Sequence, residues 1–215
     1  MTQNRSGAPL RLRRAGAAVL LLRLPGRDQG RACEVDAAQL GADGVEVGLG
    51  VLRPTPARAA GRVAGAAVTW MTPPGYVSDT LLPAMAKGRL RRAAPCPASS
   101  PSCTPAVDRP GRNAYRLAHA AAHVHLAGPH YADMLRRADL RVHHSRPNLG
   151  ARALVDAGVF LHGPPGDIAA RLADYGRAGV DEVVVNVAGV YANHGQPDAV
   201  RDLREILATC REATT

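Results

Sequence analysis

The chain has 215 residues, of which 46% are hydrophobic, so it is long and apolar enough to bury a core and is not compositionally disordered. Its net charge of +9 comes almost entirely from arginine, because Lys87 is the only lysine. Since the arginines are spread along the chain and aromatic residues make up only 3%, the composition argues against a protein that binds nucleic acid by stacking bases on aromatic rings.

A short apolar run over residues 15–22 follows three arginines and looks like the start of a secretory leader. Arg23 ends the run, it is too short to span a bilayer, and no small-x-small cleavage pattern follows it. We therefore interpret it as a buried strand or short helix within an otherwise irregular segment, 1–40. We expect a cytoplasmic protein with no membrane partner.

The four cysteines are Cys33, Cys96, Cys103 and Cys210, and no two of them form a C-x-x-C pair. Their spacing therefore does not predict a structural zinc site. An even number of cysteines allows two disulfides. The chain is not a small cysteine-dense scaffold, however, so free thiols are favoured.

A regular pattern begins near Gly41. Residues 44–51 (GVEVGLGV) predict a strand that runs into a loop. Thr55 is predicted to cap a helix over 57–64, with Pro56 at its first helical position. Residues 66–71 (AAVTWM) predict a second strand that is buried on both faces, as parallel strands usually are. A further helix is expected over 76–87.

The middle of the chain is less regular. Residues 93–112 are rich in proline and serine and predict an excursion without secondary structure. A helix is expected to begin near Asn113, to be interrupted at Gly128-Pro129 and to resume over 130–138. Residues 151–161 predict another helix.

The last part carries the clearest pattern. Residues 167–177 predict an amphipathic helix, and Gly179 stands where a C-terminal capping glycine belongs. The β-branched run 180–187 then predicts a strand, and 197–211 predict a final helix. The succession of helix, glycine, strand, loop and helix indicates an α/β protein with a parallel sheet.

Four stretches, in this order, resemble the luciferase-like monooxygenase family, which includes the coenzyme F-420-dependent reductases. They are 51–70 (VLRPTPARAAGRVAGAAVTW), 69–88, 114–140 and 163–189. The resemblance implies an incomplete TIM (βα)8-type barrel with parallel strands and a helix-rich C-terminal half, with 41–215 forming the partial barrel domain. Because fewer than eight strands are recognisable, we expect a truncated or diverged member that covers the C-terminal part of the barrel.

Cofactor-binding residues are expected at the helix start near Thr55. Free backbone N–H groups and the positive end of the helix dipole attract phosphate there. Gly48 and Gly50 let the backbone approach a ligand, and Arg53, where the family usually has glycine, can pair with phosphate. The resemblance implies coenzyme F-420, a deazaflavin, as the cofactor, with FMN as the alternative. An ordinary capped helix with solvated arginines is the competing interpretation.

Trp70 and Thr72 stand at the C-terminal end of a predicted strand, where active sites of barrels are built. We interpret them as substrate-binding residues; a core tryptophan and a helix-capping threonine are the alternative. Asn186 and Gly189, at the end of the last predicted strand, are further candidates for such a site, with weaker support. No catalytic residue can be assigned.

The histidines of the helix predicted to begin near Asn113 do not indicate a metal site. His119 and His123 have i, i+4 spacing, but no glutamate lies between them as in an H-E-x-x-H motif, and no third ligand is evident. We therefore expect partly exposed histidines and no metal.

The function predicted by the resemblance is hydride transfer between a deazaflavin or flavin cofactor and a small organic substrate. A non-catalytic remnant of the same fold is the first alternative, since the first half of the barrel is missing. A basic nucleic-acid-binding protein is the second, although no nucleic-acid-binding motif is present. The sequence is also compatible with a homo-oligomer.

Overall fold

The chain builds one parallel sheet. The structure, a computed structural model, describes residues 20–22, 47–89 and 98–213. The strands β1 (Leu20–Leu22), β2 (Val47–Gly50), β3 (Ala66–Trp70), β4 (Ala98–Val107) and β5 (Phe160–Gly163) lie side by side in chain order, and β6 (Val184–Val185) pairs with β4. Every pairing is parallel. The described strands form an open sheet, as an incomplete barrel predicts.

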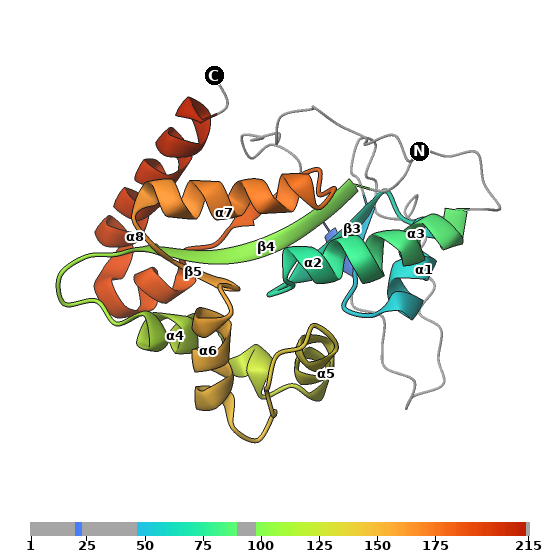
Figure 1. Cartoon of the computed structure of the whole chain (residues 1–215), viewed down its shortest axis with the longest axis horizontal. Helices are drawn as coiled ribbons and strands as arrows, with labels where there is room; N and C mark the ends of the chain where they lie inside the picture. Colours follow the sequence, from blue (N-terminus) through green and yellow to red (C-terminus); the bar gives the residue numbers. More distant parts are fainter. Residues whose placement is uncertain (1–19, 23–46, 90–97, 214–215) are drawn as a thin grey trace.

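Helices separate the strands and cover the sheet (Figure 1). In that view α7 lies above β4, whereas α4 and α6 lie below it. The helical elements are α1 (Pro54–Val63), α2 (Pro74–Tyr76), the π-helical η3 (Val77–Leu81), α3 (Leu82–Arg89), α4 (Ala114–Leu126), α5 (Pro129–Arg137), α6 (Pro147–Asp156), α7 (Pro165–Arg177) and α8 (Ala188–Glu212). No helix within the described ranges is long and apolar enough to span a bilayer.

The predicted strand–helix–strand unit at the start of the described domain is confirmed. Gly48 of β2 pairs with Ala66 of β3 in parallel register, and α1 connects the two strands. The predicted helix over 76–87 is also present, as α2, η3 and α3 in succession. Leu20–Leu22 form a strand beside β2, which agrees with the interpretation of the apolar run as a strand. The rest of segment 1–40 lies outside the described residues.

The prediction of an irregular excursion over 93–112 is wrong for residues 98–107, which form β4. Prolines 101 and 105 lie inside this strand, and each lacks one N–H donor. Residues 98–102 pair with β3, residues 102–103 pair with β6, and residues 104–107 pair with β5. A residue's N–H points to only one neighbouring strand, so a strand whose two halves have different partners can accommodate proline. Residues 93–97 lie outside the described residues.

Two boundaries near the C-terminal half also differ from the prediction. The helix expected over 151–161 ends at Asp156, because Gly158 adopts a left-handed conformation and the chain then enters β5. The strand expected over 180–187 pairs with β4 only at Val184 and Val185. In both places apolar character was correct, but periodicity alone could not separate strand from helix or coil over so few residues.

Other local signals are confirmed. Asn113 caps α4, because its Oδ1 accepts a hydrogen bond from the Arg116 amide at 3.1 Å. The helix ends before Gly128-Pro129, and α5 follows. Gly179 adopts a φ of 89° just after α7, as a capping glycine does. The final predicted helix corresponds to α8, which is interrupted at Gly195.

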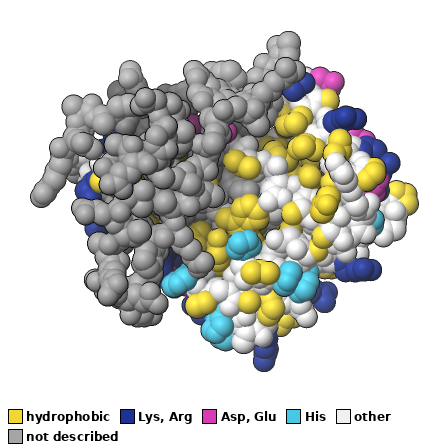
Figure 2. Space-filling view, turned by 180° about the vertical axis from the view of Figure 1, so that it is seen from behind, with side chains coloured by type: hydrophobic (Ala, Val, Ile, Leu, Met, Phe, Trp, Pro, Cys, Tyr) yellow, Lys and Arg dark blue, Asp and Glu magenta, His cyan; other side chains and the backbone are white. Residues whose placement is uncertain are grey.

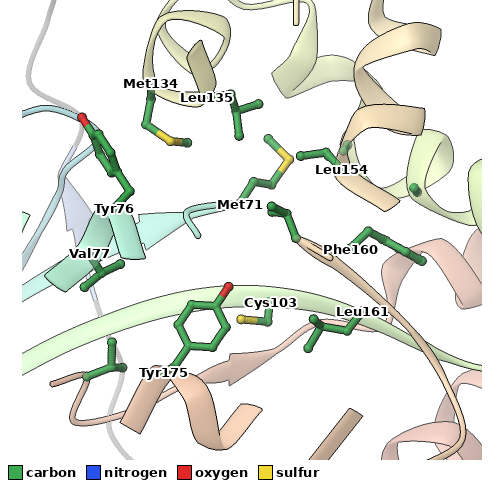
Figure 3. Packing of buried hydrophobic residues seen from close by; sticks show 14 of the residues in the cluster. Met71, Tyr76, Val77, Cys103, Met134, Leu135, Leu154, Phe160, Leu161 and Tyr175 are labelled. Atoms are coloured by element: carbon green, nitrogen blue, oxygen red, sulfur yellow. The ribbon is translucent and has the colours of Figure 1, made fainter. Parts of the chain in front are cut away.

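The core lies between the sheet and its helices and is built mainly from aliphatic side chains and methionine. Figure 3 shows Met71 pointing toward Leu135 and Leu154, and Tyr175 beside Cys103. Tyr175 is 2% exposed, and its hydroxyl donates to the Thr72 carbonyl at 3.1 Å. The side chains that follow β3 are therefore fixed by contacts with α5, α6 and α7.

Cys103 should be inert toward thiol reagents in the folded protein. Burial raises the pKa of this thiol to about 12, so almost no thiolate forms at pH 8. Cys210 is only half-buried, and no disulfide joins it to Cys103. Consider a variant with Cys33 and Cys96 replaced by serine, treated with an aromatic disulfide reagent at pH 8. We expect one thiol per chain, that of Cys210, to react rapidly, and the second, that of Cys103, to react only after unfolding in urea. Two rapid equivalents would contradict the packing around Cys103.

Candidate active site at the carboxyl ends of β2 and β3

The candidate site lies where β2 and β3 end. Both strands run parallel, so their carboxyl ends and the following loops meet at one edge of the sheet. The Val51 amide donates to the Val68 carbonyl at 2.8 Å and extends this pairing beyond β2. The loops then lead directly into α1 and α2. This edge therefore brings Arg53, from the first loop, near Trp70, at the end of β3.

The start of α1 differs from the expected capped terminus. The helix begins at Pro54, its N-cap residue is Arg53, and no side chain caps it, so the prediction of a Thr55 cap is wrong. The first intrahelical bond joins the Ala57 amide to the Arg53 carbonyl at 3.1 Å. Four N–H groups precede that bond in an ordinary helix, but Pro54 and Pro56 have none. Only the Arg53 and Thr55 amides remain for an anion. Thr55 itself is exposed.

Arg53 provides the positive charge at this helix start. Its Nη2 donates to Nδ1 of His130 at 3.0 Å, and its Nη1 lies 3.7 Å from Oδ2 of Asp133. The arginine side chain is 41% exposed, and an exposed ion pair of this kind contributes only about 0–1 kcal/mol. Arg53 can therefore exchange Asp133 for a phosphate, which binds guanidinium more strongly through paired hydrogen bonds.

Trp70 begins a row of three rings. Its ring lies 5.4 Å from that of His125, and the His125 ring lies 5.0 Å from that of Tyr131 in an edge-on arrangement. Trp70 is half-buried, yet its indole Nε1 is buried and has no hydrogen-bond partner in the described part of the chain. A buried donor without an acceptor costs about 1–3 kcal/mol. An acceptor supplied by a bound ligand would remove that cost.

Thr72, predicted to bind substrate, serves the turn after β3 instead of facing open space. The side chain is 1% exposed, and its hydroxyl hydrogen bonds to the Thr69 hydroxyl and to the Trp70 carbonyl. Met71, between them, adopts a left-handed conformation with φ of 52°, which reverses the chain toward α2. Thr72 therefore positions Trp70, and a direct contact with substrate stays a prediction.

The two glycines of β2 are placed differently from one another. Gly48 is buried in the strand, whereas Gly50 is exposed at its carboxyl end. No described atom lies within 4 Å of the position that a Cβ of Gly50 would occupy, so a ligand has room there. The role of the two glycines in cofactor binding stays a prediction.

Sequence reasoning missed the contribution of Tyr76 and α5. Burial raises the pKa of Tyr76, while Arg137 and Arg53 oppose this rise and Asp133 adds to it. The phenolic hydroxyl donates to the Leu52 carbonyl at 3.3 Å, and Asp133 accepts from Arg137 at 3.0 Å. The first loop, the second loop and α5 thus share one network of charges. No sequence signal links α5 to the other two segments, because α5 begins more than 50 residues after Tyr76.

Asn186 and Gly189, at the end of β6, have structural roles. The Asn186 amide donates to the Cys103 carbonyl at 2.8 Å and extends the pairing of β6 with β4. Gly189 lies against α4, where a Cβ would come within 2.4 Å of the Leu117 carbonyl oxygen. Asn186 also lines a surface pocket of about 520 Å³ formed by residues of β6 and α8, whereas Gly189 does not, and a role of these two residues in a functional site stays a prediction.

The carboxyl ends of β4 and β5 carry a second polar pair. His162 Nε2 lies 3.6 Å from Asp108 Oδ1, and the histidine is 20% exposed. On α4, His119 and His123 stack with ring centres 5.1 Å apart. Figure 2 shows histidine side chains gathered beside hydrophobic ones in the lower part of the molecule, seen from behind. In the described ranges no three potential ligands are close enough to share a metal ion.

No protein-family model matches the sequence, and a search of curated proteins finds no match. Solved structures do match. An F420-dependent secondary alcohol dehydrogenase, solved in complex with an F420-acetone adduct, superposes with a TM-score of 0.52 and 12% identity over 79% of this chain and 50% of its own. The coenzyme F420-dependent tetrahydromethanopterin reductase from Methanopyrus kandleri superposes with a TM-score of 0.55 and 14% identity over 80% and 51%, respectively.

These similarities concern the fold alone, because the sequence identities are low. The chain spans about half the length of each of these two proteins. Its open parallel sheet with interleaved helices therefore has the fold of part of each of these two proteins.

Proposed function

We propose that this chain is an oxidoreductase that binds a deazaflavin, coenzyme F420, at the carboxyl ends of β2 and β3. The observation that carries the proposal is the position of Trp70 at this edge, with an indole N–H that has no acceptor, together with the cationic Arg53 in the neighbouring loop. The fold supports it, because two solved structures with this fold are named as F420-dependent enzymes. FMN is the alternative cofactor.

The residues present fit such a cofactor in two respects. Arg53 and the two free amides at the start of α1 offer donors to a phosphate, although two prolines make this terminus weaker than an ordinary one. Trp70, His125 and Tyr131 offer a wall of rings and one unpaired donor to a planar group. When bound, a deazaflavin supplies the hydride chemistry, as cofactors generally do.

The protein's own part is to bind, orient and exclude water. Arg53 and the Thr55 amide would hold the anionic end of the cofactor. Trp70, held in place by Thr72 through the hydroxyl contact with its carbonyl, would limit where the ring and a small organic substrate can lie.

Replacement of Arg53 by glutamine should weaken F420 binding by about tenfold or more, because a charge-assisted hydrogen-bond pair to phosphate is lost. The matched control is Arg116→Gln, which removes an exposed arginine on α4 and lowers the net charge equally. The dissociation constant can be measured by equilibrium dialysis at fixed ionic strength. An equal effect of both substitutions would mean that only net charge attracts the cofactor.

The alternative function, a non-catalytic remnant of the fold, makes the opposite prediction. The wild-type chain would then bind neither F420 nor FMN saturably at high micromolar concentration. The network around Arg53 would in that case act only as surface packing between α1 and α5. Binding of F420 together with reduction or oxidation of a small alcohol or ketone would exclude the remnant.

A further inference from the structure

We propose that the loop between α5 and α6 forms a second binding site, which takes a phosphate monoester carried on an apolar group. A surface pocket of about 530 Å³ lies here, lined by three arginines, one histidine and leucine and valine side chains. It begins at Arg136, one helical turn beyond Asp133 on α5, and is separate from the edge of the sheet described above. The proposal does not depend on the proposed redox function.

The positive charge in this pocket is largely uncompensated. The guanidinium groups of Arg141 and Arg146 have no ion pair or hydrogen bond within the described ranges, although both side chains line the pocket. Arg136 lies 4.0 Å from the nearest carboxylate oxygen, on Asp133. Asp139 is the only carboxylate among the lining residues, so three guanidinium groups face one negative charge. This balance favours a doubly charged anion over a neutral ligand.

His143 adds an imidazole ring whose orientation is fixed by Ser145. Its Nδ1 accepts from the Ser145 amide at 3.3 Å and also bonds the Ser145 hydroxyl at 2.7 Å. Since Nδ1 accepts, the ring proton of the neutral imidazole lies on Nε2, which is then a donor. An imidazole N–H thus joins the guanidinium groups among the residues that line the pocket.

The remaining wall explains why the ligand should carry an apolar group. Leu149, in the first turn of α6, is 53% exposed although it is a large hydrophobic residue, and it lines the pocket with Leu140. The N-terminus of α6, which begins after Arg146, also contributes the positive end of its dipole. A phosphate near the arginines would place an attached ring or short chain against Leu149.

Phenyl phosphate and inorganic phosphate are suitable probes, measured by calorimetry on the full chain at fixed ionic strength. We expect saturable one-to-one binding of phenyl phosphate, at least about threefold tighter than that of inorganic phosphate because of apolar contact with Leu149. The double variant Arg141→Gln/Arg146→Gln should weaken phenyl phosphate binding by about tenfold or more. Leu149→Ser should reduce the advantage of phenyl phosphate over inorganic phosphate.

The matched control is Arg116→Gln/Arg204→Gln, which removes the same charge from exposed positions on α4 and α8. It should leave the binding of phenyl phosphate nearly unchanged. Equal losses in the two double variants would overturn the proposal, since they would show attraction by net charge alone. The absence of saturable binding by the wild-type chain, or equal affinities for the two probes, would also overturn it. Neither probe contains a deazaflavin, so these results are independent of the redox proposal.

Discussion

Replacement of Asp202 by alanine is expected to lower the free energy of unfolding by about 3–5 kcal/mol, because it leaves a buried arginine without its main partner. Asp202 is 0% exposed and lies on α8. Its carboxylate accepts from the Val107 amide at 3.0 Å, from Arg109 Nε at 3.1 Å and from Arg112 Nη1. Asp202 thus compensates two guanidinium groups and one backbone amide from a fully buried position.

The size of this effect follows from Arg112. Its side chain is only 2% exposed, so its charge cannot be rescued by water when Asp202 is removed. Arg112 also donates to the Val107 carbonyl at 2.8 Å and lies 3.2 Å from Asp198. These contacts still compensate part of the arginine's charge when Asp202 is replaced. The network therefore joins the carboxyl end of β4 to α8.

Urea unfolding at neutral pH measures the loss. Glu212→Gln, at the exposed end of the same helix, is the matched control and should change the unfolding free energy by less than about 0.5 kcal/mol. A loss below about 1 kcal/mol for Asp202→Ala would show that the network is more hydrated than its burial indicates.

Replacement of Gly61 by alanine should destabilise the protein by about 1–3 kcal/mol or more, because α1 and α3 pack backbone to backbone. A Cβ on Gly61 would lie 2.1 Å from the Met85 carbonyl oxygen. The reciprocal contact is similar, since a Cβ on Gly88 would lie 2.2 Å from the Arg58 carbonyl oxygen. Carbonyl oxygens of a helix cannot move aside as a flexible side chain does, so the helices must separate.

The control for this prediction is Gly166→Ala, in the first turn of α7, where no described atom lies within 4 Å of the added methyl group. Alanine is about 1 kcal/mol more favourable than glycine within a helix, so this substitution should be neutral or stabilising. Thermal or urea unfolding distinguishes the two variants. If Gly61→Ala is as stable as Gly166→Ala, the close packing of α1 on α3 is wrong.

Local signals predicted the parts of the fold that depend on local chemistry. Asn113 caps α4, Gly179 ends α7, and residues 66–70 form a buried parallel strand. Each of these outcomes depends on a few neighbouring residues, so sequence alone could predict it.

The failures arise where tertiary partners decide. Residues 98–107 contain two prolines and form a strand only because β3 and β5 pair with different halves of it. Thr55 did not become the cap, because the helix already begins at Pro54. Propensity rules describe the segment itself and cannot include such partners.

The candidate site shows the same division. Arg53 and Trp70 were predicted, because each follows a recognisable strand. The ring of His125, 5.4 Å from Trp70, comes from a helix 55 residues later in the chain, and His130 and Asp133 reach Arg53 from α5. Only the fold brings these side chains together, so the sequence could indicate the edge of the sheet but not the composition of the site.

The most direct test is a titration of the wild-type chain with coenzyme F420 while the tryptophan emission is recorded, because Trp70 is the chain's single tryptophan. Bound cofactor beside the indole should quench this emission saturably, and Arg53→Gln should shift the midpoint to higher concentration by about tenfold. Emission that changes only in proportion to added F420, as light absorption by free cofactor does, would contradict a cofactor site at the carboxyl end of β3.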